Sequence, residues 1–154
     1  MSGNAPEIDL PQLPNARVAI ISSSWHLDIC NDLIAGAERA LAAAAIKNVE
    51  VIYVPGSFEI PLASQIAFEK GTDAVVAVGL VLEGETPHFD YVCQGVTQGV
   101  MDVSLKFSAP IGFGVLMCNT LDQAVARSGR PGSSEDKGYD GAVAAIKLLQ
   151  LKEG

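Results

Sequence analysis

The chain has 154 residues, which corresponds to one domain able to bury a substantial core. Ten basic residues stand against eighteen acidic ones, and the net charge of −8 argues against a protein that binds nucleic acid or an anionic membrane. Apolar residues make up 49% of the chain and charged residues only 18%, so we expect contacts between subunits.

Residues 1–14 contain three prolines and no regular hydrophobic period, so we expect an extended N-terminal arm, either frayed or laid on a neighbour. A single domain is expected over residues 15–154. Within it, the β-rich apolar segments that predict strands are 17–23, 49–54, 73–82 and 111–118. The helical patterns that follow them cover 27–45, 61–70, 88–107, 120–128 and 135–151.

The predicted strands are continuously hydrophobic rather than alternating, which indicates that both faces of the sheet are covered. Strands of this kind, separated by helices, predict a parallel sheet with right-handed crossovers in a three-layer α/β/α sandwich. In such a sheet, ligands bind beyond the carboxyl ends of the strands, where the strand order reverses. For the order 2-1-3-4 the crevice is flanked by loops 22–26 and 83–88, with loop 55–61 beside them.

The loop "EGETPH" (83–88) has the features of a phosphate site. Thr86 is a good N-cap and Pro87 suits the first helical position, so free backbone amides after flexible Gly84 can surround an anion. The helix dipole disfavours an imidazolium ion here, which would leave His88 able to accept or pass on a proton. The alternative for His88 is an ordinary surface or capping histidine.

Aromatic residues mark the other expected walls of the crevice. Trp25, the single tryptophan, follows a serine-rich loop and could stack on a planar heterocycle, or else form a lid over the core. Phe58 could wall a pocket, while Glu59 could accept a hydrogen bond from a polyol hydroxyl or simply stabilise a helix N-terminus. Phe113 lies between two glycines, which indicates close backbone approach to a ligand or another subunit; the alternative is a core phenylalanine.

Two cations near the C-terminus, Arg127 and Lys137, could meet a phosphate, although each alone is usually a solvated charge. Three widely spaced cysteines without CxxC spacing indicate reduced thiols. We find no basic segment followed by an apolar run at the N-terminus, and no apolar stretch of about 20 residues. We therefore expect a cytoplasmic protein without membrane partners.

Six segments together resemble the 6,7-dimethyl-8-ribityllumazine synthase family, in order and spacing, from about residue 15 to the C-terminus. They are "SSW", "PGSFEIP", "GETPHFDYV", "PIGFGVL", "DQAVARSG" and "EDKG". The resemblance implies a flavodoxin-like, four-stranded parallel sheet, with the N-terminal arm adding to a neighbouring subunit's sheet. It also implies condensation of 5-amino-6-(D-ribitylamino)uracil with 3,4-dihydroxy-2-butanone 4-phosphate, without metal or cofactor.

The resemblance also assigns roles to individual residues. His88 would be the acid/base histidine, Trp25 the aromatic stacker, and Arg127 a phosphate ligand. The residues that would hold the ribityl chain and pyrimidine are Ser57, Phe58 and Glu59, with Leu82 near the ring. Those that would bind phosphate with Arg127 are Gly84, Glu85 and Thr86. Active sites in the family lie between subunits, so the neighbouring subunit would contribute three site residues, Phe113, Arg127 and Lys137.

The family implies a homo-oligomer, a pentamer or a pentamer-based assembly, and association with riboflavin synthase is a further expectation. The loop between Arg127 and Lys137 is longer than in members that build icosahedral shells, which favours a plain pentamer. Alternatives are a non-catalytic flavin- or lumazine-binding protein on the same fold, and a shell protein with secondary enzymatic activity. The presence of His88 and Arg127 argues against the binding protein, because binding alone needs no site for a departing phosphate.

Overall fold

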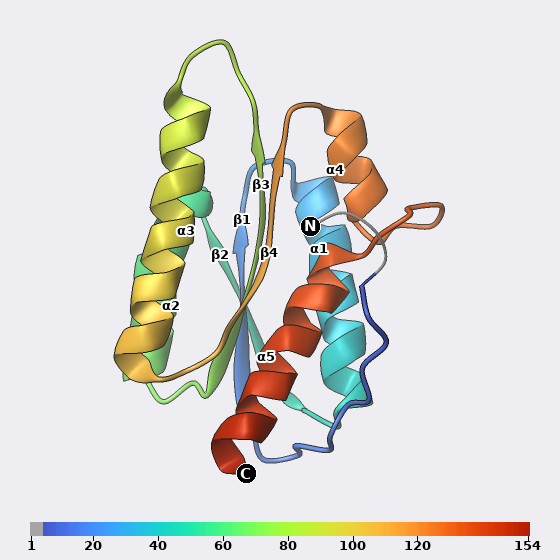
Figure 1. Cartoon of the computed structure of the whole chain (residues 1–154), viewed down its shortest axis with the longest axis vertical. Helices are drawn as coiled ribbons and strands as arrows, with labels where there is room; N and C mark the ends of the chain where they lie inside the picture. Colours follow the sequence, from blue (N-terminus) through green and yellow to red (C-terminus); the bar gives the residue numbers. More distant parts are fainter. Residues whose placement is uncertain (1–4) are drawn as a thin grey trace.

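The computed structural model describes residues 5–154 and contains one four-stranded parallel sheet with helices on both faces (Figure 1). The strand order is β2-β1-β3-β4, so the predicted flavodoxin-like α/β/α fold is confirmed. The strands are β1 (Arg17–Ser23), β2 (Asn48–Val54), β3 (Ala74–Leu82) and β4 (Ile111–Cys118).

The helices form two layers. Those on one face are α2 (Ile60–Glu69) and α3 (His88–Phe107), and those on the other are α1 (Leu27–Ala43), α4 (Leu121–Arg127) and α5 (Lys137–Glu153). Each predicted strand and helix ends within two residues of its observed bounds. The expected loop between β2 and α2 is not wholly irregular, because it contains a short 3₁₀ helix, η1 (Ser57–Glu59).

The core has two halves, one on each side of the sheet, and neighbouring residues of β1 serve different halves. Val18 and Ile20 pack beneath α1 and α5, whereas Ala19 and Ile21 pack beneath α2 and α3. All four side chains are at most 3% exposed. Burial on both faces explains the continuous hydrophobicity of the central strands β1 and β3, whereas the edge strand β2 is only partly buried.

Helix α5 contacts its neighbours at backbone distance. A Cβ atom added at Gly138 would lie 2.0 Å from the carbonyl oxygen of Leu33 in α1, and one at Gly112 in β4 would lie 1.9 Å from the carbonyl oxygen of Gly141. The close approach predicted beside Phe113 is therefore made by α5 of the same chain at Gly112. These contacts fix the start of α5, and with it Lys137, against α1 and β4.

The described part of the N-terminal arm lies against its own domain. Leu10 and Leu13 pack on the α1 side of the core, and the Leu13 amide donates to the carbonyl of Ala44 at 2.8 Å. Residues 1–4 of the predicted arm lie outside the described residues. Within residues 5–154, no helix has the length and apolar character needed to cross a membrane.

We predict that Gly138→Ala lowers the free energy of unfolding by about 1–3 kcal/mol, because the new methyl group would overlap a backbone carbonyl. Helix propensity alone predicts that Gly138→Ala raises the free energy of unfolding, since alanine is favoured over glycine by about 1 kcal/mol within helices. Urea unfolding at one protein concentration measures the difference. The control is Gly84→Ala, where an added Cβ meets nothing within 4 Å. Equal stability of Gly138→Ala and the wild type would refute this steric account.

Candidate active site

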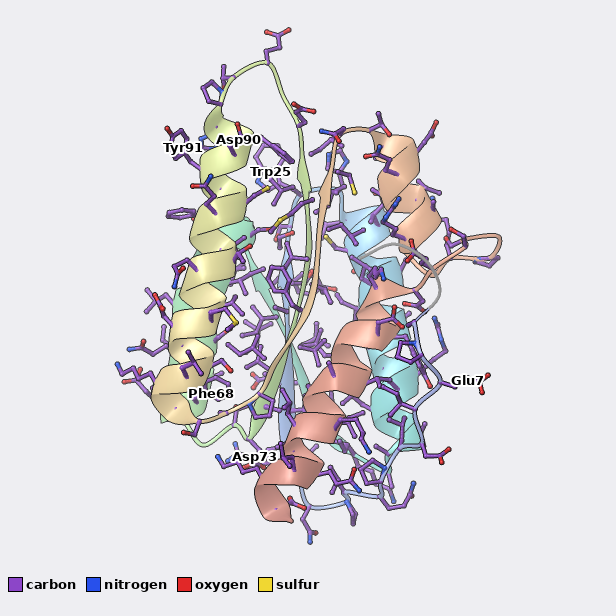
Figure 2. The ribbon with its side chains drawn as sticks, viewed as in Figure 1. Glu7, Trp25, Phe68, Asp73, Asp90 and Tyr91 are labelled. Carbon is purple, nitrogen blue, oxygen red and sulfur yellow. The ribbon has the colours of Figure 1, made fainter. Side chains whose placement is uncertain are left out.

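A cleft of about 780 Å³ opens at the carboxyl ends of β1 and β3, where the strand order reverses. In Figure 2, Trp25 lies between the first turn of α3, which carries Asp90 and Tyr91, and the ends of the strands. The residues that line the cleft are Trp25, His26, Pro55, Gly56, Ser57, Phe58, Glu59, Leu80, Val81, Leu82, His88, Tyr91 and Val92. The cleft thus occupies the position expected for a ligand site in an open parallel sheet.

Trp25 stands at the surface of the cleft rather than over the core. Its side chain is 67% exposed, so the alternative of a core lid is wrong. A hydrogen bond from α1 holds the backbone of Trp25 in place, because the Cys30 thiol donates to the Trp25 carbonyl oxygen at 3.2 Å. Burial raises the pKa of the Cys30 thiol, which keeps the sulfur protonated as a donor. The backbone that carries the indole is therefore fixed, and one face of the ring is open to a ligand.

Helix η1 places three predicted site residues on the cleft wall. The Ser57 hydroxyl is buried and has no hydrogen-bond partner among the described residues, which leaves it to pair with a ligand. Phe58 is 59% exposed and packs its ring edge near Gly95 of α3. Glu59 uses Oε2 to accept from the Gly56 amide at 2.9 Å, so its carboxylate also has the local structural role considered as the alternative.

His88 is the first residue of α3 and is exposed on the cleft rim. The predicted start at residue 88 is confirmed, but Pro87, with a ψ of −1°, occupies the N-cap position rather than the first helical position. Thr86 still contributes to the helix start, since its hydroxyl accepts from the His88 amide at 3.4 Å. Gly84, Glu85 and Thr86 lie in the exposed loop before α3 and do not line the cleft.

Three other predicted site residues lie away from the cleft of their own chain. Phe113 lies on β4 and is 40% exposed, so the alternative of a core phenylalanine is wrong. Arg127 ends α4 and Lys137 begins α5, on the sheet face opposite α3. This placement suits a site completed by a second subunit.

Several lining residues were not predicted from the sequence. Tyr91 and Val92 follow His88 by three and four residues, so they share its helical face, a signal that the spacing alone could have given. Leu80 and Val81 precede the predicted Leu82 on β3 and were treated only as strand residues. His26 was given no role, yet it lines the cleft with a left-handed φ of 53°.

A second hollow of about 530 Å³ lies between α3 and β4 and contains none of the predicted site residues. It is lined by Cys93, Gln94, Thr97, Gln98 and Met117. The cleft beside Trp25 is therefore the candidate active site.

Fold and cleft together define a flavodoxin-like α/β protein with a cleft at the carboxyl edge of its sheet, where proteins of this fold class bind ligands. A family model described as 6,7-dimethyl-8-ribityllumazine synthase matches residues 15–153, and the chain belongs to that family.

Curated relatives with that name span nearly the whole chain. The relative from Streptomyces coelicolor is 49% identical over 95% of this chain and 91% of its own length. That from Pseudarthrobacter chlorophenolicus is 49% identical over 95% and 94%, respectively. That from Nocardioides sp. is 45% identical over 99% and 96%.

We predict that a bound planar heterocycle quenches the fluorescence of Trp25 saturably, because the exposed indole is the single tryptophan and borders the cleft. Titration with riboflavin, corrected for its absorbance, measures the effect. D-ribitol serves as the control ligand, since it lacks the ring and should leave the emission unchanged. Binding of riboflavin detected by equilibrium dialysis without any change in emission would contradict stacking on Trp25.

Proposed function

We propose that this chain catalyses the condensation of 5-amino-6-(D-ribitylamino)uracil with 3,4-dihydroxy-2-butanone 4-phosphate, which yields 6,7-dimethyl-8-ribityllumazine, phosphate and water. This is the penultimate step of riboflavin biosynthesis. The observation that carries the proposal is the convergence of Trp25, Ser57 and His88 on one cleft in a chain of this family. The non-catalytic binding protein is not favoured, because every named relative above is a synthase.

The cleft is suited to hold the pyrimidine substrate on one side. The free face of Trp25 can stack on the ring, with Leu82 beside it. The unpartnered Ser57 hydroxyl and the rest of η1, Phe58 and Glu59, are positioned to contact the ring and ribityl chain. A volume of about 780 Å³ is in the range of small-molecule sites.

The second substrate would place its phosphate at the loop before α3. Backbone amides of Gly84, Glu85 and Thr86 would bind it at the helix N-terminus, and Arg127 of the neighbouring subunit would add a charged fork. The amine attacks the ketone carbonyl and water leaves to form an imine. Loss of a proton from the neighbouring carbon then expels phosphate and leaves an enol, which tautomerises to a ketone. The ribitylamino nitrogen attacks this ketone, and a second water leaves as the ring closes to the lumazine.

His88 would carry protons during these steps, since it lies on the rim between the two proposed subsites. One positioned acid/base group contributes about 10²–10⁴-fold to a rate. Alignment of the two substrates supplies a further part of the acceleration, because their translational and rotational entropy is lost on binding rather than in the chemical step. We therefore expect His88 to speed the reaction without being indispensable.

The active enzyme would be a homopentamer in the cytoplasm. Phe113, Arg127 and Lys137 lie outside the cleft of their own chain, so adjacent subunits would have to share each site. The proposed arm is residues 1–14, and residues 15–154 would form the catalytic domain. Because Leu10 and Leu13 pack on their own chain, only the part of the arm before Leu10 would extend onto the neighbour's sheet. Association with riboflavin synthase would pass the lumazine to the next enzyme.

We predict that His88→Ala lowers kcat by about 100-fold, at the lower end of the range for an acid/base group. Arg127→Ala should lower kcat/KM further, because loss of Arg127 weakens both phosphate binding and leaving-group stabilisation. The absorbance of the lumazine product, confirmed by mass, measures both rates. The control is Arg17→Ala, which also removes one positive charge, but at the amino end of the strands, away from the cleft. Comparable activity of Arg127→Ala and the wild type would contradict the ranking, and absence of lumazine from the wild type would refute the function.

We predict a particle of about five times the 16.1 kDa chain mass by analytical ultracentrifugation. Co-refolding His88→Ala with Arg127→Ala subunits should restore activity, because about a quarter of the interfaces in a randomly mixed ring regain both native residues. Each variant refolded alone provides the baseline. Mixed assemblies no more active than that baseline would show that Arg127 does not act across a subunit boundary.

A further inference from the structure

Glu135 lies between Arg127, the cation proposed to bind phosphate, and Lys137. Its Oε2 atom is 3.6 Å from Nε of Arg127, and its Oε1 atom is 3.0 Å from Nζ of Lys137. The Glu135 side chain is only 14% exposed, whereas that of Arg127 is 40% exposed. The contact with Glu135 is the main cause that raises the pKa of the Lys137 ammonium. One carboxylate therefore joins the last turn of α4 to the first turn of α5.

The backbone holds Glu135 in this position. Its amide donates to the carbonyl of Ala126 at 3.0 Å, and its own carbonyl accepts from the Gly129 amide at 3.1 Å. The next residue, Asp136, caps α5 through the Tyr139 amide and pairs with Arg39 of α1 at 2.6 Å. Such a carboxylate loses little entropy when it binds the cations, unlike a surface ion pair.

A second carboxylate reaches the same lysine. Asp140 lies 3.5 Å from Lys137 Nζ, so two cations face two anions within a few ångströms. When all four groups are ionised, they carry no net charge. A phosphate that reaches Arg127 and Lys137 therefore meets oriented N–H donors, but not an uncompensated positive field.

We propose that Glu135 is a positioning residue that holds Arg127 and Lys137 together and limits how tightly they retain phosphate. The proposal rests on the proposed function, in which Arg127 binds the phosphate of the butanone substrate, and it adds Lys137 beside Arg127 as a second phosphate donor. An enzyme that expels phosphate must also release it before the next turnover. A fixed carboxylate between the cations keeps their geometry and repels the dianion, which favours release.

The test is Glu135→Gln, which preserves the shape and the acceptor oxygen but removes the charge. Isothermal titration with inorganic phosphate at fixed ionic strength should show roughly tenfold tighter binding than the wild type. The KM for the butanone phosphate should fall with it, and kcat should not rise. A residue that only stabilises the fold would instead lower the thermal midpoint without tightening phosphate binding. Glu69→Gln, which removes a carboxylate at the end of α2, is the matched control.

Asp140→Asn provides a second variant if Glu135→Gln does not assemble. Asp140 contacts only one of the two cations, and burial raises the pKa of its carboxyl, so we expect tightening in the same direction but smaller. Unchanged or weaker phosphate binding in the assembled variants would overturn the proposal, as would a wild type that binds no phosphate. A wild type that binds phosphate but forms no lumazine would instead refute the proposed function and leave this inference standing.

Discussion

The need to cover both faces of one parallel sheet determines where this protein can bind a ligand. A parallel sheet exposes hydrophobic side chains on both sides, and β1 buries alternate residues under different helical layers. Right-handed crossovers can cover both faces of the sheet only if the chain adds strands on both sides of β1, with β2 on one side and β3 and β4 on the other. The loops after β1 and β3 must then leave the sheet on opposite faces, and the cleft lies between them.

The same constraint explains what could be predicted from the sequence. Apolar runs identified all four strands, although Glu50 interrupts that of β2, and the strand order followed from the resemblance to a known fold. The loop residues correctly placed Trp25 and His88 at the carboxyl edge of the sheet, because proline and glycine mark where the strands end. Helix η1 was missed because three residues show no helical period. It is defined by backbone hydrogen bonds such as that from the Glu59 amide to the Gly56 carbonyl, and the Glu59 carboxylate accepts from the Gly56 amide in return.

Other parts of the site could not be predicted from local pattern, for two physical reasons. Tyr91 and Val92 are ordinary helix residues by composition, and they become lining residues only because the start of α3 borders the cleft. Arg127 and Lys137 flank a loop on the opposite face of the sheet, and no period or cap connects them to His88. Their assignment came from the family resemblance, since a single chain's geometry separates them from its cleft.

The charge of the chain sets a further requirement on any anion site. A protein with a net charge of −8 has a long-range field that repels phosphate, so binding must come from short-range, oriented donors. Helix N-terminal amides meet this requirement because they carry no net charge. The Arg127, Glu135 and Lys137 cluster meets it in another way, because a largely buried carboxylate holds the two cations in place and also offsets their charge. In both cases recognition depends on direct contact, so an expelled phosphate that leaves the site is not drawn back by the surrounding field.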